Sequence, residues 1–133
     1  MKNGLILFAH GARDPRWARP FEAVARQVGD ARADALVRLA YLEFMPPDLL
    51  TAGAELARAG CTTVEIVPLF LGAGGHVRRD LPLLLEALRV AHPQARWTLH
   101  AAVGEIEAVV AAMAAAATAT LPPAAATTAR AAP

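Results

Sequence analysis

Short apolar runs alternate with amphipathic stretches four times over the first 117 of the 133 residues. The runs lack polar breaks, which is typical of strands covered on both faces in a parallel sheet. Apolar positions at helical spacing fill the stretches between them and predict helices. The predicted strands are residues 4–9, 36–42, 63–68 and 96–101, and the last predicted helix covers residues 106–117.

Polar residues and prolines mark where the first three helices begin. Asp14 precedes a proline and is expected to cap the first helix, whose regular part should begin near Pro20. Asp48 follows two prolines and opens the second helix. Asp80 is expected to cap the third helix, with Pro82 in its first turn.

Strictly alternating strands and helices predict an α/β fold. Right-handed crossovers then give a three-layer, doubly wound, four-stranded parallel sheet, most simply in the order 2-1-3-4. In such a sheet, ligands bind beyond the carboxyl ends of the strands. His10, Glu43 and the glycine-rich loop that carries His76 all follow predicted strands, so we expect them at one edge.

Composition and charge exclude several classes of protein. Thirteen basic residues against twelve acidic ones give no basic field for nucleic acid. A single cysteine, Cys61, excludes an internal disulfide and cysteine-rich zinc sites, and fits a reducing cytoplasm. No apolar run is long enough to span a membrane. Residues 1–117 are expected to form one domain, and the Ala/Thr/Pro-rich tail, residues 118–133, to be disordered.

The glycine loop after the third strand needs to be compared with nucleotide-binding loops. In a dinucleotide fingerprint the third glycine would fall at Val77, and no acidic residue follows at the ribose spacing. The chain also has no serine and no phosphate-binding lysine. We therefore expect no nucleotide. Two imidazoles and a carboxylate at one rim instead suit iron, cobalt, nickel or zinc.

Three motifs in order resemble a known family. They read His10-Gly11-Ala12-Arg13-Asp14-Pro15, then Leu42-Glu43-Phe44 with Pro46, then Val67-Pro68-Leu69-Phe70-Leu71 leading to Gly75-His76-Val77 and Asp80-Leu81-Pro82. Over residues 1–115 the chain resembles the sirohydrochlorin chelatases, close to their single-domain form. These enzymes insert cobalt or iron in cobalamin and siroheme synthesis.

The resemblance implies a function and a set of site residues. It implies ATP-independent insertion of Co²⁺ or Fe²⁺ into sirohydrochlorin, with Ni²⁺ also compatible, and His10, Glu43 and His76 as catalytic, metal-handling residues. Substrate carboxylates would be held by basic side chains and a helix N-terminus. The candidates for this role are Arg13, Gly74, Gly75, Arg78 and Arg79.

The chain also departs from the family and leaves alternatives open. Ala12 stands where the family commonly has serine, which would remove a hydrogen bond at the rim. The chain looks like one half of the longer two-domain members, so we expect a homodimer that forms the cleft. One alternative is a carrier that binds a metal or tetrapyrrole without catalysis. Another is a regulatory half-domain that pairs with a different chain.

Overall fold

The computed structural model describes residues 2–72 and 74–124, and its centre is the strand β1, Lys2–Ala9. Strand β1 pairs in parallel with β2, Ala35–Tyr41, and with β3, Cys61–Pro68. The short strand β4, Arg96–Leu99, pairs in parallel with β3. The sheet order β2-β1-β3-β4 confirms the predicted topology.

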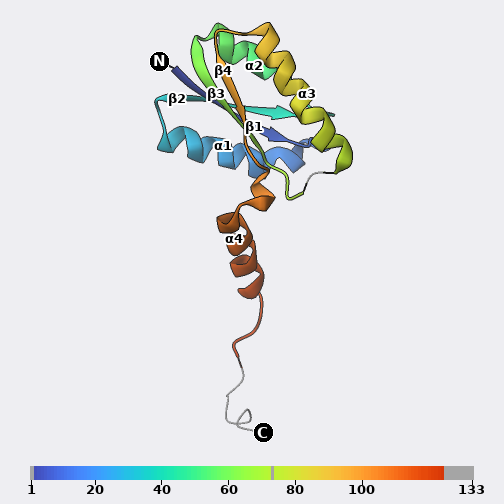
Figure 1. The fold of residues 1–133 in the computed structure, drawn as a ribbon. Helices are drawn as coiled ribbons and strands as arrows, with labels where there is room; N and C mark the ends of the chain where they lie inside the picture. Colours follow the sequence, from blue (N-terminus) through green and yellow to red (C-terminus); the bar gives the residue numbers. More distant parts are fainter. Residues whose placement is uncertain (1, 73, 125–133) are drawn as a thin grey trace.

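The helices cover the two faces of this sheet unequally. The helix α1, Arg19–Ala31, lies on one face, and α2, Leu49–Arg58, and α3, Gly75–Ala91, lie on the other (Figure 1). The last helix, α4, Glu107–Thr118, follows the 3₁₀ turn η2, Val103–Glu105, and stands away from the sheet (Figure 1). The result is three layers in which the layer containing α1 is only half filled.

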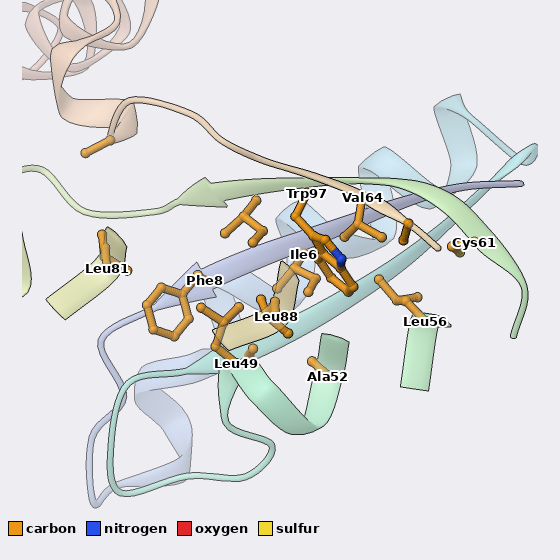
Figure 2. Packing of buried hydrophobic residues seen from close by; sticks show 14 of the residues in the cluster. Ile6, Phe8, Leu49, Ala52, Leu56, Cys61, Val64, Leu81, Leu88 and Trp97 are labelled. Atoms are coloured by element: carbon orange, nitrogen blue, oxygen red, sulfur yellow. The ribbon is translucent and has the colours of Figure 1, made fainter. Parts of the chain in front are cut away.

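The main hydrophobic core lies between the sheet and the α2–α3 layer. Figure 2 shows Phe8 of the sheet near Leu49 of α2 at one end of this core and Leu56 of α2 at the other end, with Ile6, Val64 and the fully buried Trp97 ring between them. Burial of each such side chain is worth about 1.5–3 kcal/mol. A smaller cluster under α1 has the buried residues Ala9, Ala18 and Tyr41.

The first two helix starts follow the capping chemistry predicted from the sequence. The Asp14 carboxylate accepts the Arg16 backbone N–H at 2.9 Å and opens a 3₁₀ turn, η1, Pro15–Ala18, before α1 begins beside Pro20. The Asp48 carboxylate accepts the Thr51 backbone N–H at 2.8 Å and caps α2. In each case one otherwise unpaired N–H group at the helix start is satisfied.

The predicted start of the third helix is wrong. Helix α3 begins at Gly75, with the extended residue Gly74 as its N-cap, and the Arg78 N–H already donates to the Gly74 carbonyl at 3.0 Å. Asp80 therefore lies inside the helix, and so does Pro82. Proline is tolerated in the first turn of a helix because its missing N–H costs least there, but the predicted N-cap, Asp80, lies six residues after the observed one, Gly74.

The remaining differences are small, and part of the tail stays untested. Strand β4 ends at Leu99 where the sequence predicted residue 101, and α4 is displaced by one residue from the predicted range. The expected disorder of the tail concerns residues 118–133, of which 125–133 lie outside the described residues. In the part of the chain that the structure describes, no helix is long and apolar enough to cross a membrane.

Candidate functional site

The carboxyl ends of β1, β2 and β3 bring three loops to one rim of the sheet. His10 directly follows β1, and Glu43 follows β2 by two residues. The loop after β3 leads into the start of α3, where His76 is the second helical residue. All three side chains are exposed, so each is available to a ligand at this rim.

His10 and Glu43 are held side by side by their main chains. The Leu42 N–H donates to the Ala9 carbonyl at 2.9 Å, and the Glu43 N–H donates to the His10 carbonyl at 3.1 Å. These bonds continue the pairing of β1 with β2 past the ends of both strands. The position of the carboxylate therefore depends on the position of the histidine.

Gly11 makes this close approach possible. Its φ is +92°, in the left-handed region that side chains disfavour, and a Cβ atom there would collide with the carbonyl oxygen of Glu43. From the sequence, Gly11 was only one residue of a motif, and no role was predicted for it. The available signal was a glycine directly after a histidine at the end of a buried strand.

Arg13, a predicted substrate-binding residue, also lies at this rim. Its guanidinium carbon is 4.8 Å from the centre of the Phe44 ring, a cation–π contact. Phe44 itself has φ of +67° and is 56% exposed, which is unusual for a large aromatic residue. The loop after β2, at residues 43–44, thus contacts the loop after β1, at residues 10–13.

The exit from β3 supports the histidine from the other side. The edge of the His10 ring meets the Phe70 ring, with the two ring centres 5.4 Å apart. Phe70 is only 4% exposed, and its carbonyl accepts the Gly104 N–H at 2.9 Å. Sequence analysis did not identify Phe70 as a site residue because its contact with His10 exists only in the folded chain.

The start of α3 carries the other predicted residues. Gly74 is the N-cap and Gly75 the first helical residue, and a Cβ atom on either would have open space around it. Arg78 and Arg79 follow within the next turn, and Arg78 lies 3.8 Å from the Glu105 carboxylate. The helix N-terminus that could hold an anion is therefore at Gly74, and the expectation that it lies near Asp80 is wrong.

Within one chain the three predicted ligands do not form a closed metal centre. Among the described residues, no group of three His, Cys, Asp or Glu side chains is close enough to hold one ion. His10 and Glu43 are coupled through their backbones, while His76 sits apart on a helix. The rim therefore offers open imidazole and carboxylate donors, which suit borderline divalent metals and also accept protons.

Two further carboxylates near this rim, Asp14 and Asp48, stabilise helix starts. Hydrogen bonds from the Arg16 side chain and then its backbone lower the pKa of Asp14. Hydrogen bonding from Thr51 likewise lowers the pKa of Asp48. Both act as helix caps, whereas Glu43 caps no helix.

An apolar hollow opens beside the loop after β2 that carries Glu43. It has a volume of about 430 Å³ and lies at the ends of β1 and β2, between the start of α2 and the middle of α3. Its wall includes Leu42, which precedes Glu43, and the exposed side chains of Leu50 and Leu83. The rim thus combines polar donors with an apolar surface, as sites for large organic ligands do.

This arrangement has known counterparts. The sequence model of the CbiX family matches residues 4–120. The chain belongs to the CbiX family. The family that the sequence motifs resemble is thereby confirmed. A sirohydrochlorin cobaltochelatase of Methanosarcina acetivorans is 31% identical over 84 residues, which are 63% of this chain and 65% of that protein. The CbiX chain thus spans just under two thirds of this relative's length.

Solved structures share the fold. A CbiX protein of Marinobacter aquaeolei VT8, described as acting in cobalamin (vitamin B12) biosynthesis, superposes with a TM-score of 0.77 at 31% identity, over 88% of this chain and 95% of that one. The sirohydrochlorin chelatase SirB of Bacillus subtilis subspecies spizizenii, in complex with cobalt, gives 0.72 at 25% identity. The match covers 90% of this CbiX chain but 51% of SirB.

Proposed function

We propose that this CbiX protein inserts a divalent metal, Co²⁺ or Fe²⁺, into sirohydrochlorin without ATP. The observation that carries the proposal is the pairing of His10 with Glu43 at the rim, next to the loop that leads to His76. The names of the relatives support it, because one is a sirohydrochlorin cobaltochelatase and another a chelatase with bound cobalt. Histidine and carboxylate donors also accept Ni²⁺.

The proposed chemistry assigns a role to each rim residue. Insertion removes two pyrrole protons and brings a dication to the face of the ring. The His10 imidazole accepts one proton, and the Glu43 carboxylate offsets the charge of the ion and takes up the other proton. His76, on the first turn of α3, binds the incoming ion as its hydration shell is lost.

The proposed substrate contacts use the charge of the same rim. Sirohydrochlorin carries many carboxylates, and Arg13, Arg78 and Arg79 provide planar guanidinium groups for them. The N–H groups at Gly74 and Gly75 add a helix N-terminus. The apolar hollow beside Glu43 suits the flat face of a macrocycle.

The open donor set favours insertion over storage. A carrier holds its metal in a closed site, whereas here the donors of one described chain form no such cluster. We further propose that the enzyme works as a homodimer in the cytoplasm, in cobalamin or siroheme synthesis. The half-length match to SirB supports the dimer, and the free, buried Cys61 thiol fits a reducing compartment.

The test is an anaerobic incubation of the protein with sirohydrochlorin and Co²⁺ or Fe²⁺. The absorption spectrum of the tetrapyrrole should convert over many turnovers, faster than in a no-enzyme control. His10→Ala and His76→Ala should each lower the rate by at least about a hundredfold, the scale of a lost acid–base group. His92→Ala, at the far end of α3, is the matched histidine control and should retain the rate.

Two outcomes would contradict the proposal. A spectral change that stops at one equivalent would identify a carrier. Unchanged insertion rates in both the His10→Ala and His76→Ala proteins would remove the assigned roles, whatever the wild-type rate.

A further inference from the structure

One residue of the rim is exposed and strained at the same time. Phe44 has φ of +67°, and the Met45 N–H donates to the Glu43 carbonyl at 2.9 Å, so that the bond spans Phe44. A bond of this kind around a central residue with positive φ makes a γ-turn of the rare and strained form. Among the described residues, Phe44 is the only one other than glycine with a positive φ.

The hydrophobic core gains little from the Phe44 ring, because the residue is 56% exposed. The residues on either side of it are held in place. The Glu43 N–H donates to the His10 carbonyl at 3.1 Å, and Met45 packs against the buried cluster that contains Tyr41. The chain is thus fixed before and after the turn, and the strain falls on the residue between. A backbone outlier that is held by its neighbours and not by its own burial points to a functional constraint.

The contact that this conformation provides is with Arg13. The guanidinium carbon of Arg13 lies 4.8 Å from the centre of the Phe44 ring, so the ring covers one face of the planar cation. Within residues 2–72 and 74–124, Arg13 has no ion pair and no side-chain hydrogen bond. Asp14, its neighbour in the chain, is bonded to Arg16 at 2.8 Å instead. The donors of Arg13 are therefore available to a ligand.

Contact with an aromatic ring changes what the arginine can do. An arginine side chain is long and loses much rotamer freedom when a ligand fixes it. A ring against one face of the guanidinium limits this freedom before the ligand arrives, and it leaves the N–H groups at the edge of the plane unused. A carboxylate can then accept two of these N–H groups side by side. Arg13 is thus preorganised for a planar anion.

The same two loops also carry the paired donors. Glu43 directly precedes Phe44, and His10 lies three residues before Arg13. Main-chain bonding joins Glu43 to His10, and the ring contact joins Phe44 to Arg13. The position of the guanidinium is therefore linked to that of the metal-handling pair through both loops.

We propose that Phe44 is a positioning residue for the substrate, whose ring holds Arg13 ready for a peripheral carboxylate of the tetrapyrrole and so directs the macrocycle toward His10 and Glu43. This inference deepens the proposed function and rests on it. The strained turn has a use, because it places the aromatic ring at the surface of the rim, beside the exposed guanidinium. Phe44 acts on binding through Arg13 and leaves the chemistry to the paired donors.

The first test separates the strain from the binding. Phe44→Gly removes the ring, and glycine adopts a positive φ without strain. We expect its melting temperature to rise by about 2–4 °C. Its affinity for metal-free sirohydrochlorin, followed by the absorption of the tetrapyrrole during titration, should fall at least about tenfold. Phe44→Tyr keeps the ring and should bind within about twofold of wild type.

The control is Val90→Ala, which removes apolar surface from a residue that is 73% exposed on α3. It should leave the affinity for sirohydrochlorin unchanged.

The second test asks whether Phe44 acts through Arg13. Arg13→Met removes the charge and should weaken binding at least about tenfold, and Phe44→Leu alone should weaken it at least about fivefold. In the Arg13→Met protein the ring has no guanidinium to hold, so adding Phe44→Leu should weaken binding less than about twofold further. In the insertion assay, Phe44→Leu should raise KM and leave kcat within about twofold, since the ring touches no reacting atom.

Three results would overturn the inference. If Phe44→Gly binds sirohydrochlorin as tightly as wild type, the ring has no part in binding. If the effects of Arg13→Met and Phe44→Leu multiply, the ring acts independently of Arg13. If kcat falls while KM is unchanged, the substitution disturbs the chemistry and not the positioning.

The inference and the proposed reaction fail in different ways. A protein that shows the expected binding pattern but inserts no metal overturns the reaction and leaves the role of Phe44 standing. Metal insertion with unaltered binding in the Phe44 variants does the reverse. A wild-type protein that binds no sirohydrochlorin overturns both.

Discussion

At the scale of single residues, the rim depends on contacts that a side chain in the wrong place would destroy. Gly11 is the clearest case, because its positive φ and the nearby Glu43 carbonyl both exclude a Cβ atom. Gly29, in α1, has no atom within 4 Å of the Cβ position. The two glycines therefore make a matched pair, one constrained by the site and one free.

Replacing Gly11 by alanine should disturb both the fold and the site. We expect Gly11→Ala to lower the free energy of unfolding by about 2 kcal/mol, because the backbone is strained or the Glu43 loop moves. The insertion rate should fall at least about tenfold, since misplacement of a reacting group is costly. Urea unfolding and the spectral assay measure the two effects.

Gly29→Ala is the control for this change. It should stabilise the protein by about 0.5–1 kcal/mol, because alanine is the better helix former, with no effect on the rate. If both alanine variants behaved alike, the contact between Gly11 and Glu43 would have no role in the site.

The residues that sequence alone could find at the rim are those that directly follow strands. His10 and Glu43 follow apolar runs whose ends meet in any parallel sheet, so chemistry and topology together locate them. Phe70 and Phe44 were not identified as site residues, because an aromatic residue near an apolar run is more typical of the hydrophobic core. Their contacts with His10 and Arg13 arise from loop conformation, such as the positive φ of Phe44, which no periodic pattern encodes.

At the scale of elements, the caps decide where helices begin. Asp48 is the cap of α2, and its contribution should depend on pH. Hydrogen bonding from Thr51 holds the pKa of Asp48 below its ordinary value. The stabilisation is thus complete above the unfolded pKa of about 3.9 and is lost as the pH falls through the lower pKa of the folded state.

Asp48→Ala should therefore lower the free energy of unfolding by about 1 kcal/mol at neutral pH. The gap to wild type should close in acid, as chemical denaturation at a series of pH values would show. Asp30→Ala, which removes an exposed carboxylate from the last turn of α1, should produce no such gap. A gap at Asp48 that persisted unchanged into acid would exclude the capping carboxylate as its source.

A second element-scale prediction concerns the approach of α2 to its neighbours. A Cβ atom at Gly53 would collide with Leu88 of α3 and lie 3.2 Å from the Trp97 ring. We expect Gly53→Ala to destabilise the protein by about 1–3 kcal/mol, because both neighbours are buried and cannot yield freely. Thermal unfolding measures this, and a stabilised protein would show that α2 can shift outward at no cost.

The error over α3 shows what capping rules miss. Asp80 before a leucine and a proline has the local pattern of a helix start, yet the helix begins at Gly75. A glycine N-cap offers no side-chain signal, and Pro82 is tolerated inside the helix, so the stronger local pattern was the misleading one. The strands and the first two helices were predictable because the spacing of the apolar residues and the capping residues indicate the same boundaries there.

At the scale of the whole molecule, the strand topology was predictable from the sequence, whereas the expected homodimer stays a prediction. The order of the four strands follows from alternation and crossover handedness, and the structure confirms it. The apolar pattern of α4 is the same whether a helix lies on its own sheet or on another. The outward course of the chain at residues 100–106, which carries α4 away from its own sheet, is seen only in the folded chain (Figure 1).

Because His10, Glu43 and His76 follow strands of one sheet, each site should draw all three from one chain. Mixing inactive His10→Ala and His76→Ala proteins under conditions of subunit exchange should then restore no insertion. A recovery to about a quarter of the wild-type rate would instead mean that each site takes its histidines from two chains, since half of the random dimers would hold one intact site.

The contact of Gly104 with the loop after β3 has a consequence for how the protein could respond to load. Gly104, just before α4, donates a hydrogen bond to the carbonyl of Phe70, and the Phe70 ring contacts His10. A force that pulls on α4 would therefore also act on Phe70. The chain at Gly104 lies so close to the loop after β3 that a methyl group there would collide with the backbone of Leu71. Tension applied to α4 would therefore reach His10 through the backbone hydrogen bond from Gly104 to Phe70 and the contact between the Phe70 and His10 rings.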